Sequence, residues 1–85
     1  MYTVIYSKQA ARTLQKIPRN VTGLIQKKID EIAINPAEQH ANVTKLVGRA
    51  GFRLRVGDWR VIYKLEDEQL IMLVIRIGPR GDVYR

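Results

Sequence analysis

The stretch at residues 51–64, "GFRLRVGDWRVIYK", restricts the fold of this chain more than any other. Apolar residues alternate with other residues on both sides of Gly57-Asp58, and this period of two is typical of strands with one buried face. A two-residue connection that begins with glycine suits a type II′ hairpin turn. The stretch therefore predicts a β-hairpin made of residues 52–56 and 59–65.

The alternation also predicts what each face of the hairpin carries. The apolar set of the second strand is expected to face the core: Trp59, Val61, Tyr63 and Leu65. Trp59 is therefore interpreted as a core residue and not as a platform on which a nucleobase stacks. The opposite face carries Ile62 and four basic residues: Arg53, Arg55, Arg60 and Lys64.

One strand and two helices are predicted before the hairpin. Residues 2–6, "YTVIY", are β-branched and aromatic, and they lead into Ser7, which is a favourable helix N-cap. Apolar residues at helical spacing predict a first helix over residues 8–17, which Pro18 ends. A second helix is predicted to end at Asn35-Pro36. Its apolar stripe consists of Val21, Leu24, Ile25, Ile29 and Ile32.

The rest of the chain predicts a loop, a strand and an irregular tail. Residues 36–50 are expected to form a connecting loop. Residues 70–77, "LIMLVIRI", are apolar on both faces, as in a central strand. The charged residue of this strand, Arg76, aligns by alternation with Leu70, Met72 and Val74. The tail at 78–85, "GPRGDVYR", contains too much glycine and proline for a strand or a helix.

These elements predict an α+β fold in the order β-α-α-β-β-β. A helical hairpin is expected to pack on one face of a small, mostly antiparallel sheet. With 85 residues the chain suffices for a single domain, residues 1–85, with one modest core. Because the helices cover one face of the sheet, the basic face of the hairpin is expected to stay accessible.

The charge of the chain indicates an anionic partner. Lysine and arginine number 15 against 8 acidic residues, for a net charge of +7. Residues 41–65 contain six basic residues and one acidic residue. Such a local excess costs self-repulsion and fits a polyanion, most commonly nucleic acid. The alternative at this point is a basic surface that serves solubility alone.

Other kinds of site have little support in the sequence. The chain has no cysteine and a single histidine, His40, in the expected loop. His40 is interpreted as an ordinary surface residue, and no metal or other cofactor is expected. No signal peptide or membrane-spanning run is recognised, so the expected location is cytoplasmic.

Residues 45–85, "KLVGRAGFRLRVGDWRVIYKLEDEQLIMLVIRIGPRGDVYR", resemble the second half of a RelE-type toxin of the RelE/ParE superfamily. The shared features are a basic strand, a G-x-x-R-[VIL]-[VIL]-Y hairpin, and a terminal G-x-R followed by x-V-Y. The β-α-α opening of the chain also fits. The resemblance implies a metal-independent endoribonuclease that cleaves messenger RNA in the ribosomal A site and inhibits translation. It also implies a cognate antitoxin that holds the enzyme inactive.

The resemblance assigns roles to five residues. Arg53 and Arg55 match two basic strand residues that are commonly lysines in relatives. Arg60 matches the arginine that binds the scissile phosphate, and Arg80 matches the arginine after the last strand. Tyr84 matches the tyrosine that assists the attacking 2′-hydroxyl.

Arginine at both strand positions leaves the general acid open, because arginine does not exchange a proton near neutral pH. Either the arginines act through their charge alone, or Lys45 or Lys64 approaches the leaving group. We expect five further basic residues to contact RNA or the ribosome: Lys45, Arg49, Lys64, Arg76 and Arg85.

Two other functions remain open on the sequence. One is a ParE-like inhibitor of DNA gyrase, which shares the fold but does not need the arginine and tyrosine set. The other is a module that binds nucleic acid or an antitoxin without catalysis. In each case a basic toxin fits an antitoxin whose neutralising segment is acidic and amphipathic.

Overall fold

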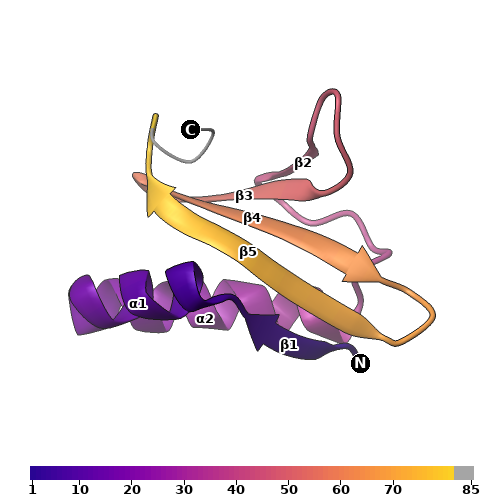
Figure 1. The fold of residues 1–85 in the computed structure, drawn as a ribbon, viewed down its shortest axis with the longest axis horizontal. Helices are drawn as coiled ribbons and strands as arrows, with labels where there is room; N and C mark the ends of the chain where they lie inside the picture. The colour runs from indigo at the N-terminus through magenta and orange to yellow at the C-terminus, as the bar shows by residue number, and fades with distance from the viewer. Residues whose placement is uncertain (82–85) are drawn as a thin grey trace.

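The computed structural model describes residues 1–81, which form two helices packed on a five-stranded sheet (Figure 1). In chain order the elements are β1 (Thr3–Tyr6), α1 (Lys8–Lys16), α2 (Arg19–Ile34), β2 (Val43–Lys45), β3 (Phe52–Val56), β4 (Trp59–Glu66) and β5 (Ile71–Pro79). The strands lie in the order β1-β5-β4-β3-β2. Only the β1–β5 pair is parallel among them. The predicted α+β class and the mostly antiparallel sheet are therefore confirmed.

The two helices begin and end where the sequence predicts, to within a residue or two. Ser7 is the N-cap of α1, and its side-chain oxygen accepts a hydrogen bond of 3.1 Å from the Ala10 amide. Pro18 is the N-cap of α2. A proline at this position stops one helix and is compatible with the start of the next, because it has no amide hydrogen to lose.

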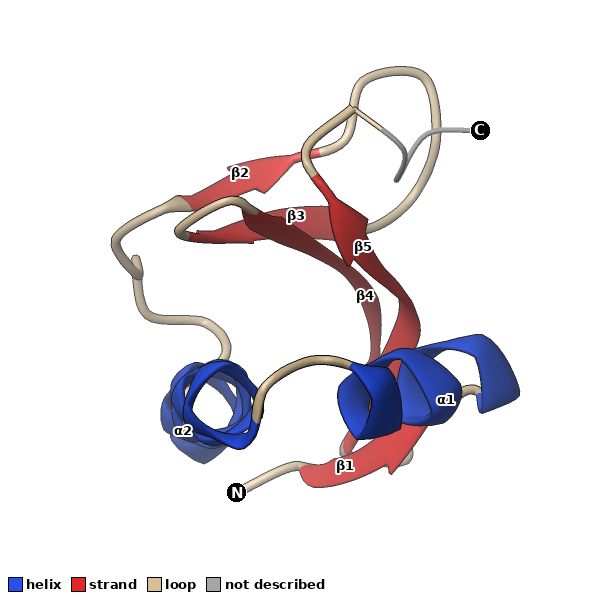
Figure 2. Ribbon diagram, turned by 90° about the vertical axis from the view of Figure 1, so that its left-hand side faces the viewer, coloured by secondary structure: helices blue, strands red, loops and turns tan. Residues whose placement is uncertain are grey.

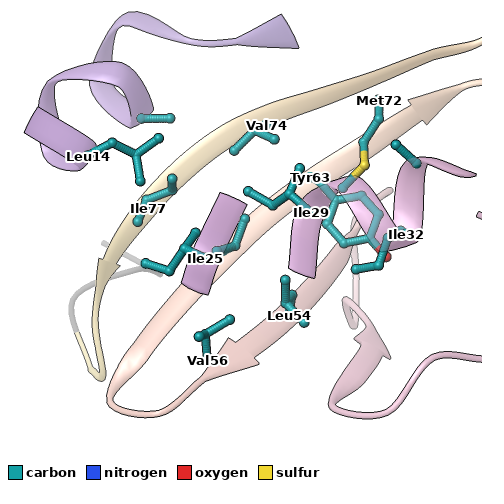
Figure 3. Close-up of a cluster of buried hydrophobic side chains, with 13 residues drawn as sticks. Leu14, Ile25, Ile29, Ile32, Leu54, Val56, Tyr63, Met72, Val74 and Ile77 are labelled. Atoms are coloured by element: carbon teal, nitrogen blue, oxygen red, sulfur yellow. The ribbon is translucent and has the colours of Figure 1, made fainter. Parts of the chain in front are cut away.

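The core lies between the concave face of the sheet and the two helices (Figures 2 and 3). Ile25 and Ile29 of α2 are completely buried, as are Val61 of β4 and Met72 of β5. Trp59 packs against this cluster, as predicted. The buried cluster as a whole comprises Ala10, Leu14, Ile25, Ile29, Ile32, Ala33, Leu54, Val56, Val61, Tyr63, Met72, Val74 and Ile77.

The prediction of a loop over residues 36–50 is wrong in its middle. Val43–Lys45 form the edge strand β2, which pairs antiparallel with β3 so that Thr44 lies opposite Arg53. Three residues are too few to show an alternating pattern. These residues form a strand because their backbone pairs with that of β3. The sheet therefore has one strand more than predicted.

The predicted alignment of Arg76 with Met72 and Val74 is also wrong. Tyr63 of β4 pairs with Val74, but its neighbour Ile62 pairs with Arg76, so β5 contains one extra residue at this point. Such a β-bulge reverses the alternation beyond it. Ile77 consequently faces the core, and Arg76 faces the opposite side together with Ile62.

Side chains from the start of α1 hold the bulged part of β5. The Ser7 hydroxyl donates to the Ile75 carbonyl at 2.6 Å. The Gln9 amide makes two hydrogen bonds to Ile77, one to its carbonyl at 2.8 Å and one from its N–H at 2.9 Å. These contacts satisfy the backbone of β5 beyond the point where β1 ends.

The tail is more regular than predicted at its start. β5 continues through Gly78 and Pro79, which pair with Arg60 and Trp59 of β4. Pro79 is tolerated because it is the last residue of the strand. The Arg80 amide then donates to the Asp58 carbonyl at 2.8 Å, so Arg80 lies beside the β3–β4 turn. Neither helix of residues 1–81 is long and apolar enough to cross a membrane.

Replacing Ile29 with alanine tests the role of α2 in the core. Ile29 is completely buried, so the variant should lose about 2–5 kcal/mol of unfolding free energy in urea titrations. Ile34→Ala in the same helix is the matched control, because Ile34 is 59 % exposed and should lose less than about 1 kcal/mol. Equal losses would contradict the assigned packing of the helix.

Tyr63 should make the stability of the fold fall at alkaline pH. Burial raises the pKa of Tyr63 to about 12 from an ordinary value of 10.0. The folded state thus prefers the neutral phenol. The contribution of Tyr63 to the free energy of unfolding is therefore complete below pH 10 and is lost as the pH rises through 12. Urea titrations of Tyr63→Phe should show a flatter profile over this range. Tyr6→Phe should remove a smaller part of the fall, because burial raises the pKa of Tyr6 less.

Candidate nucleic-acid interface

Four arginines that the sequence singles out line one hollow on the side of the sheet away from the helices. The hollow has a volume of about 510 Å³, and we call it the arginine hollow. Its lining residues are Asn42, Thr44, Arg53, Arg55, Arg60, Arg80 and Gly81. They come from β2 and the residue before it, from β3 and β4, and from the turn after β5. Figure 1 shows β2 and the turn after β5 toward the top of the sheet, with both helices below it.

Two of the arginines face each other directly across the β3–β4 pair. Arg55 lies opposite Arg60, and Arg53 lies opposite Ile62. Because neighbouring residues of β3 and β4 point into the core, alternation sends these arginines to the other face. Like charges opposite one another in a sheet oppose folding, so the arrangement concentrates positive charge where an anion could neutralise it.

The opposed guanidinium groups are held by neutral oxygens. Arg60 Nη1 donates to the Gly57 carbonyl at 2.9 Å and to the Trp59 carbonyl at 3.0 Å. Arg55 Nη2 donates to Asn42 Oδ1 at 2.9 Å. Carbonyl and amide oxygens orient a guanidinium without cancelling its charge.

A family model described as "ParE toxin of type II toxin-antitoxin system, parDE" matches residues 4–84. The chain belongs to the RelE/ParE superfamily of type II toxins. The toxin is 29 % identical to a RelE-like toxin protein of Escherichia coli, over 98 % of this chain and 90 % of that protein. It is 26 % identical to the toxin RelG of Mycobacterium tuberculosis, over 99 % and 97 % of the two chains.

Solved structures support the same fold. The toxin in the RelE-RelB complex of the archaeon Pyrococcus horikoshii superimposes with a TM-score of 0.81 and 28 % identity, over 96 % of this chain and 98 % of that one. The intact E. coli RelBE toxin-antitoxin complex also gives a TM-score of 0.81, with 24 % identity and coverage of 95 % and 99 %. The α+β fold predicted from the order of the elements, which also fits the resemblance, is thus confirmed.

Basic residues predicted to contact RNA continue the arginine hollow along the β2–β3 loop. A neighbouring hollow of about 370 Å³ is lined by Lys45, Leu46, Val47, Arg49 and Arg53, so Arg53 lines both. A further hollow of about 390 Å³ adds Lys64 to Lys45 and Arg49. Lys45 and Arg49 line both of these hollows, and the acidic residue Asp67 lines the second one with Lys64. Lys64 also lies 4.0 Å from Glu66, which reduces its share of the positive charge.

The remaining predicted site residues are not placed in the arginine hollow. Arg76 does not line it, although it shares a face of the sheet with Ile62, and its Nε is buried with no hydrogen-bond partner among the described residues. Tyr84 and Arg85 lie outside the described residues. Their roles stay predictions.

None of the tyrosines at positions 2, 6 and 63 lines the arginine hollow. A hydrogen bond to Asp67 raises the pKa of Tyr2, and burial raises the pKa of Tyr6 and Tyr63. A raised pKa makes a phenol a worse proton acceptor near neutral pH. None of these three tyrosines is therefore placed to act as a base at the arginine hollow.

Among residues 1–81, no group of three or more His, Cys, Asp or Glu side chains is placed so that it could hold a metal ion. His40 Nε2 lies 2.8 Å from the Asn35 carbonyl oxygen. This contact fits the interpretation of His40 as a structural surface residue.

Sequence reasoning missed Asn42 and Thr44, which line the arginine hollow from β2 and the residue before it. The signal that could have found them is the run "NVT", in which an asparagine that tolerates positive φ precedes two β-branched residues. Asn42 indeed has φ +66°. Finding the site fully required recognising the short strand.

Loss of one arginine should weaken polyanion binding and reduce its salt dependence by the amount expected for one phosphate contact. Arg55→Ala should bind a single-stranded 2′-O-methyl RNA oligonucleotide more weakly, with a slope of log K against log[salt] that is smaller by about 0.7. Arg19→Ala, an exposed residue of α2 on the helical side, should change neither value. Fluorescence anisotropy across a salt series measures both, and equal effects of the two variants would contradict an interface at the arginine hollow.

Proposed function

We propose that this toxin is a metal-independent endoribonuclease that cleaves messenger RNA, in the ribosomal A site, and thereby inhibits translation. The observation that carries the proposal is the convergence of Arg53, Arg55, Arg60 and Arg80 on one hollow. Planar guanidinium groups match the oxygens of a phosphodiester, and several of them around one opening fit a group whose negative charge grows during reaction.

The proposed reaction is attack of a 2′-hydroxyl on the adjacent phosphodiester. The O2′–P bond forms, the P–O5′ bond breaks, and the hydroxyl proton passes to a base. The arginines stabilise the charge that develops on the phosphoryl oxygens, and each oriented donor of this kind contributes about 2.7–4 kcal/mol in a well-formed site. Arg60 is assigned to the scissile phosphate, and Arg80, which lies beside the same β3–β4 turn, is assigned to the developing charge.

Tyr84 is assigned as the base. An ordinary tyrosine has a pKa near ~10, so this role requires nearby cations that favour the phenolate. Arg80, four residues earlier in the sequence, lines the arginine hollow.

The leaving oxygen must receive a proton or be stabilised as it departs. Neither Lys45 nor Lys64 lines the arginine hollow, and Lys64 is close to Glu66. This placement favours arginines that act through charge alone over a lysine general acid. Proton transfer to the leaving 5′-oxygen then comes from water.

Inhibition of DNA gyrase is the second candidate, because the matching family model carries the ParE description. The RelE-like relatives favour RNA cleavage instead. The four-arginine hollow also favours cleavage, because a gyrase inhibitor does not need donors around one phosphate.

An antitoxin partner is proposed along with the activity. The structural neighbours include toxin-antitoxin complexes from E. coli, P. horikoshii and M. tuberculosis. The net charge of +7 fits an antitoxin segment that is acidic and amphipathic. The other proposed partners are messenger RNA and the ribosome.

Sequencing of RNA 5′ ends after brief induction tests the activity. The unaltered toxin should produce new 5′ ends confined to translated frames. Arg80→Ala should reduce these cuts about 10²–10³-fold, and Tyr84→Phe by a comparable factor, because each removes a group that acts at the reacting atoms. Arg12→Ala, an exposed arginine of α1, is the charge-matched control and should cut normally.

Two outcomes would overturn the proposal in different ways. Intact messenger RNA together with gyrase-dependent DNA breaks would establish the second candidate. Growth arrest with normal cuts in Tyr84→Phe would remove Tyr84 from the mechanism and leave the arginines to carry it.

A further inference from the structure

The opposed arginines Arg55 and Arg60 are held in different directions. Arg60 is hydrogen-bonded to carbonyls of its own turn, at Gly57 and Trp59. Arg55 is hydrogen-bonded to Asn42. Asn42 directly precedes β2, which pairs with the edge of β3 opposite to β4. The two arginines lie opposite each other in the sheet, their guanidinium groups have different partners, and both residues line the arginine hollow.

We propose that Asn42 is a positioning residue that orients Arg55 toward the phosphate of a bound RNA. The inference rests on the proposed function and adds to it a residue outside the set that the family resemblance assigns. Asn42 acts through Arg55 and takes no part in proton transfer.

Asn42 contacts Arg55 at two points. Its carbonyl accepts from the Arg55 amide at 2.9 Å, and its side-chain Oδ1 accepts from Arg55 Nη2 at 2.9 Å. One residue thus holds both the backbone amide and the guanidinium group of Arg55. An exposed arginine otherwise samples many rotamers, and each site arginine that is already ordered spares that entropy when RNA binds.

The backbone of Asn42 supports the same reading. Asn42 has φ +66°, a conformation that costs most non-glycine residues free energy and that asparagine tolerates best. Residues held in such conformations concentrate at functional sites. Here the conformation directs both oxygens of Asn42 toward β3.

The neutrality of the Asn42 amide is part of the inference. A carboxylate at this place would hold Arg55 as well, but it would also cancel the charge that attracts phosphate. The ion pairs seen among residues 1–81, Lys28–Glu31 and Lys64–Glu66, involve neither Arg55 nor Arg60. Arg55 and Arg60 are therefore oriented by neutral oxygens, and neither takes part in an ion pair among the described residues.

Asn42→Gly is the variant that isolates the side chain. Glycine accepts φ +66° without strain and keeps the carbonyl that binds the Arg55 amide, so only Oδ1 is lost. Asn35→Gly is the matched control, because Asn35 ends α2 outside the arginine hollow and its backbone contacts also survive the change. Thermal melts of both variants establish that they fold.

A double-mutant cycle with Arg55→Ala separates positioning from general stability. The purified full-length toxin and its variants are tested for cleavage of messenger RNA on programmed ribosomes. They are also tested for binding of a single-stranded 2′-O-methyl RNA oligonucleotide by fluorescence anisotropy. Asn42→Gly should lower cleavage by about 10–100-fold, the loss expected when a reacting group is slightly misplaced, and weaken binding several-fold. In the Arg55→Ala background the same change should have no further effect.

Asn42→Asp tests the neutrality. It retains the oxygen that holds Arg55, but it should bind the oligonucleotide more weakly than the unaltered toxin at low salt. The difference should shrink as salt screens the added charge.

The outcomes separate the inference from the proposed function. Unchanged cleavage and binding in Asn42→Gly, or losses that multiply with those of Arg55→Ala, would overturn the role of Asn42. Unaltered affinity in Asn42→Asp at low salt would overturn the argument from neutrality. If the unaltered toxin leaves RNA uncut, the proposed function fails, and the binding cycle still decides whether Asn42 positions Arg55 for an anion.

Discussion

The packing of α2 against one face of the sheet determines where the arginines of this toxin point. Ile25 and Ile29 are completely buried against Val61 and its neighbours on β3–β5. Because side chains of a strand alternate between faces, burying one set forces the other set outward. The arginine hollow is thus the reverse side of the hydrophobic core.

The relative size of the two effects explains why the fold tolerates the opposed charges. Each large apolar side chain in the core contributes about 1.5–3 kcal/mol, whereas an unfavourable cross-strand pair costs on the order of 0.2–1 kcal/mol. The burial of the apolar face therefore outweighs the repulsion between Arg55 and Arg60 on the other face of the sheet. Neutral oxygens of Asn42, Gly57 and Trp59 hold the two guanidinium groups without removing their charge.

Local pattern accounts for the parts of the fold that were predicted correctly. The hairpin of β3 and β4, the N-cap at Ser7 and the break at Pro18 each depend on residues that are adjacent in sequence. The errors concern pairing between distant segments. β2 is too short to show a period of its own, and the bulge in β5 is visible only in its register with β4. Pro79 extends β5 because it pairs with Trp59 of β4, a contact between residues far apart in sequence.

The sequence by itself determined which residues share a face within each regular strand, and hence that Arg53, Arg55 and Arg60 lie together. The tertiary structure decided that Arg80 joins them, through the hydrogen bond from its amide to Asp58. It also decided that Asn42 contacts Arg55 and that Arg76 faces away from the core. The reason is physical: alternation is a property of one strand, whereas bulges, edge strands and turn contacts arise only when segments far apart in sequence pair.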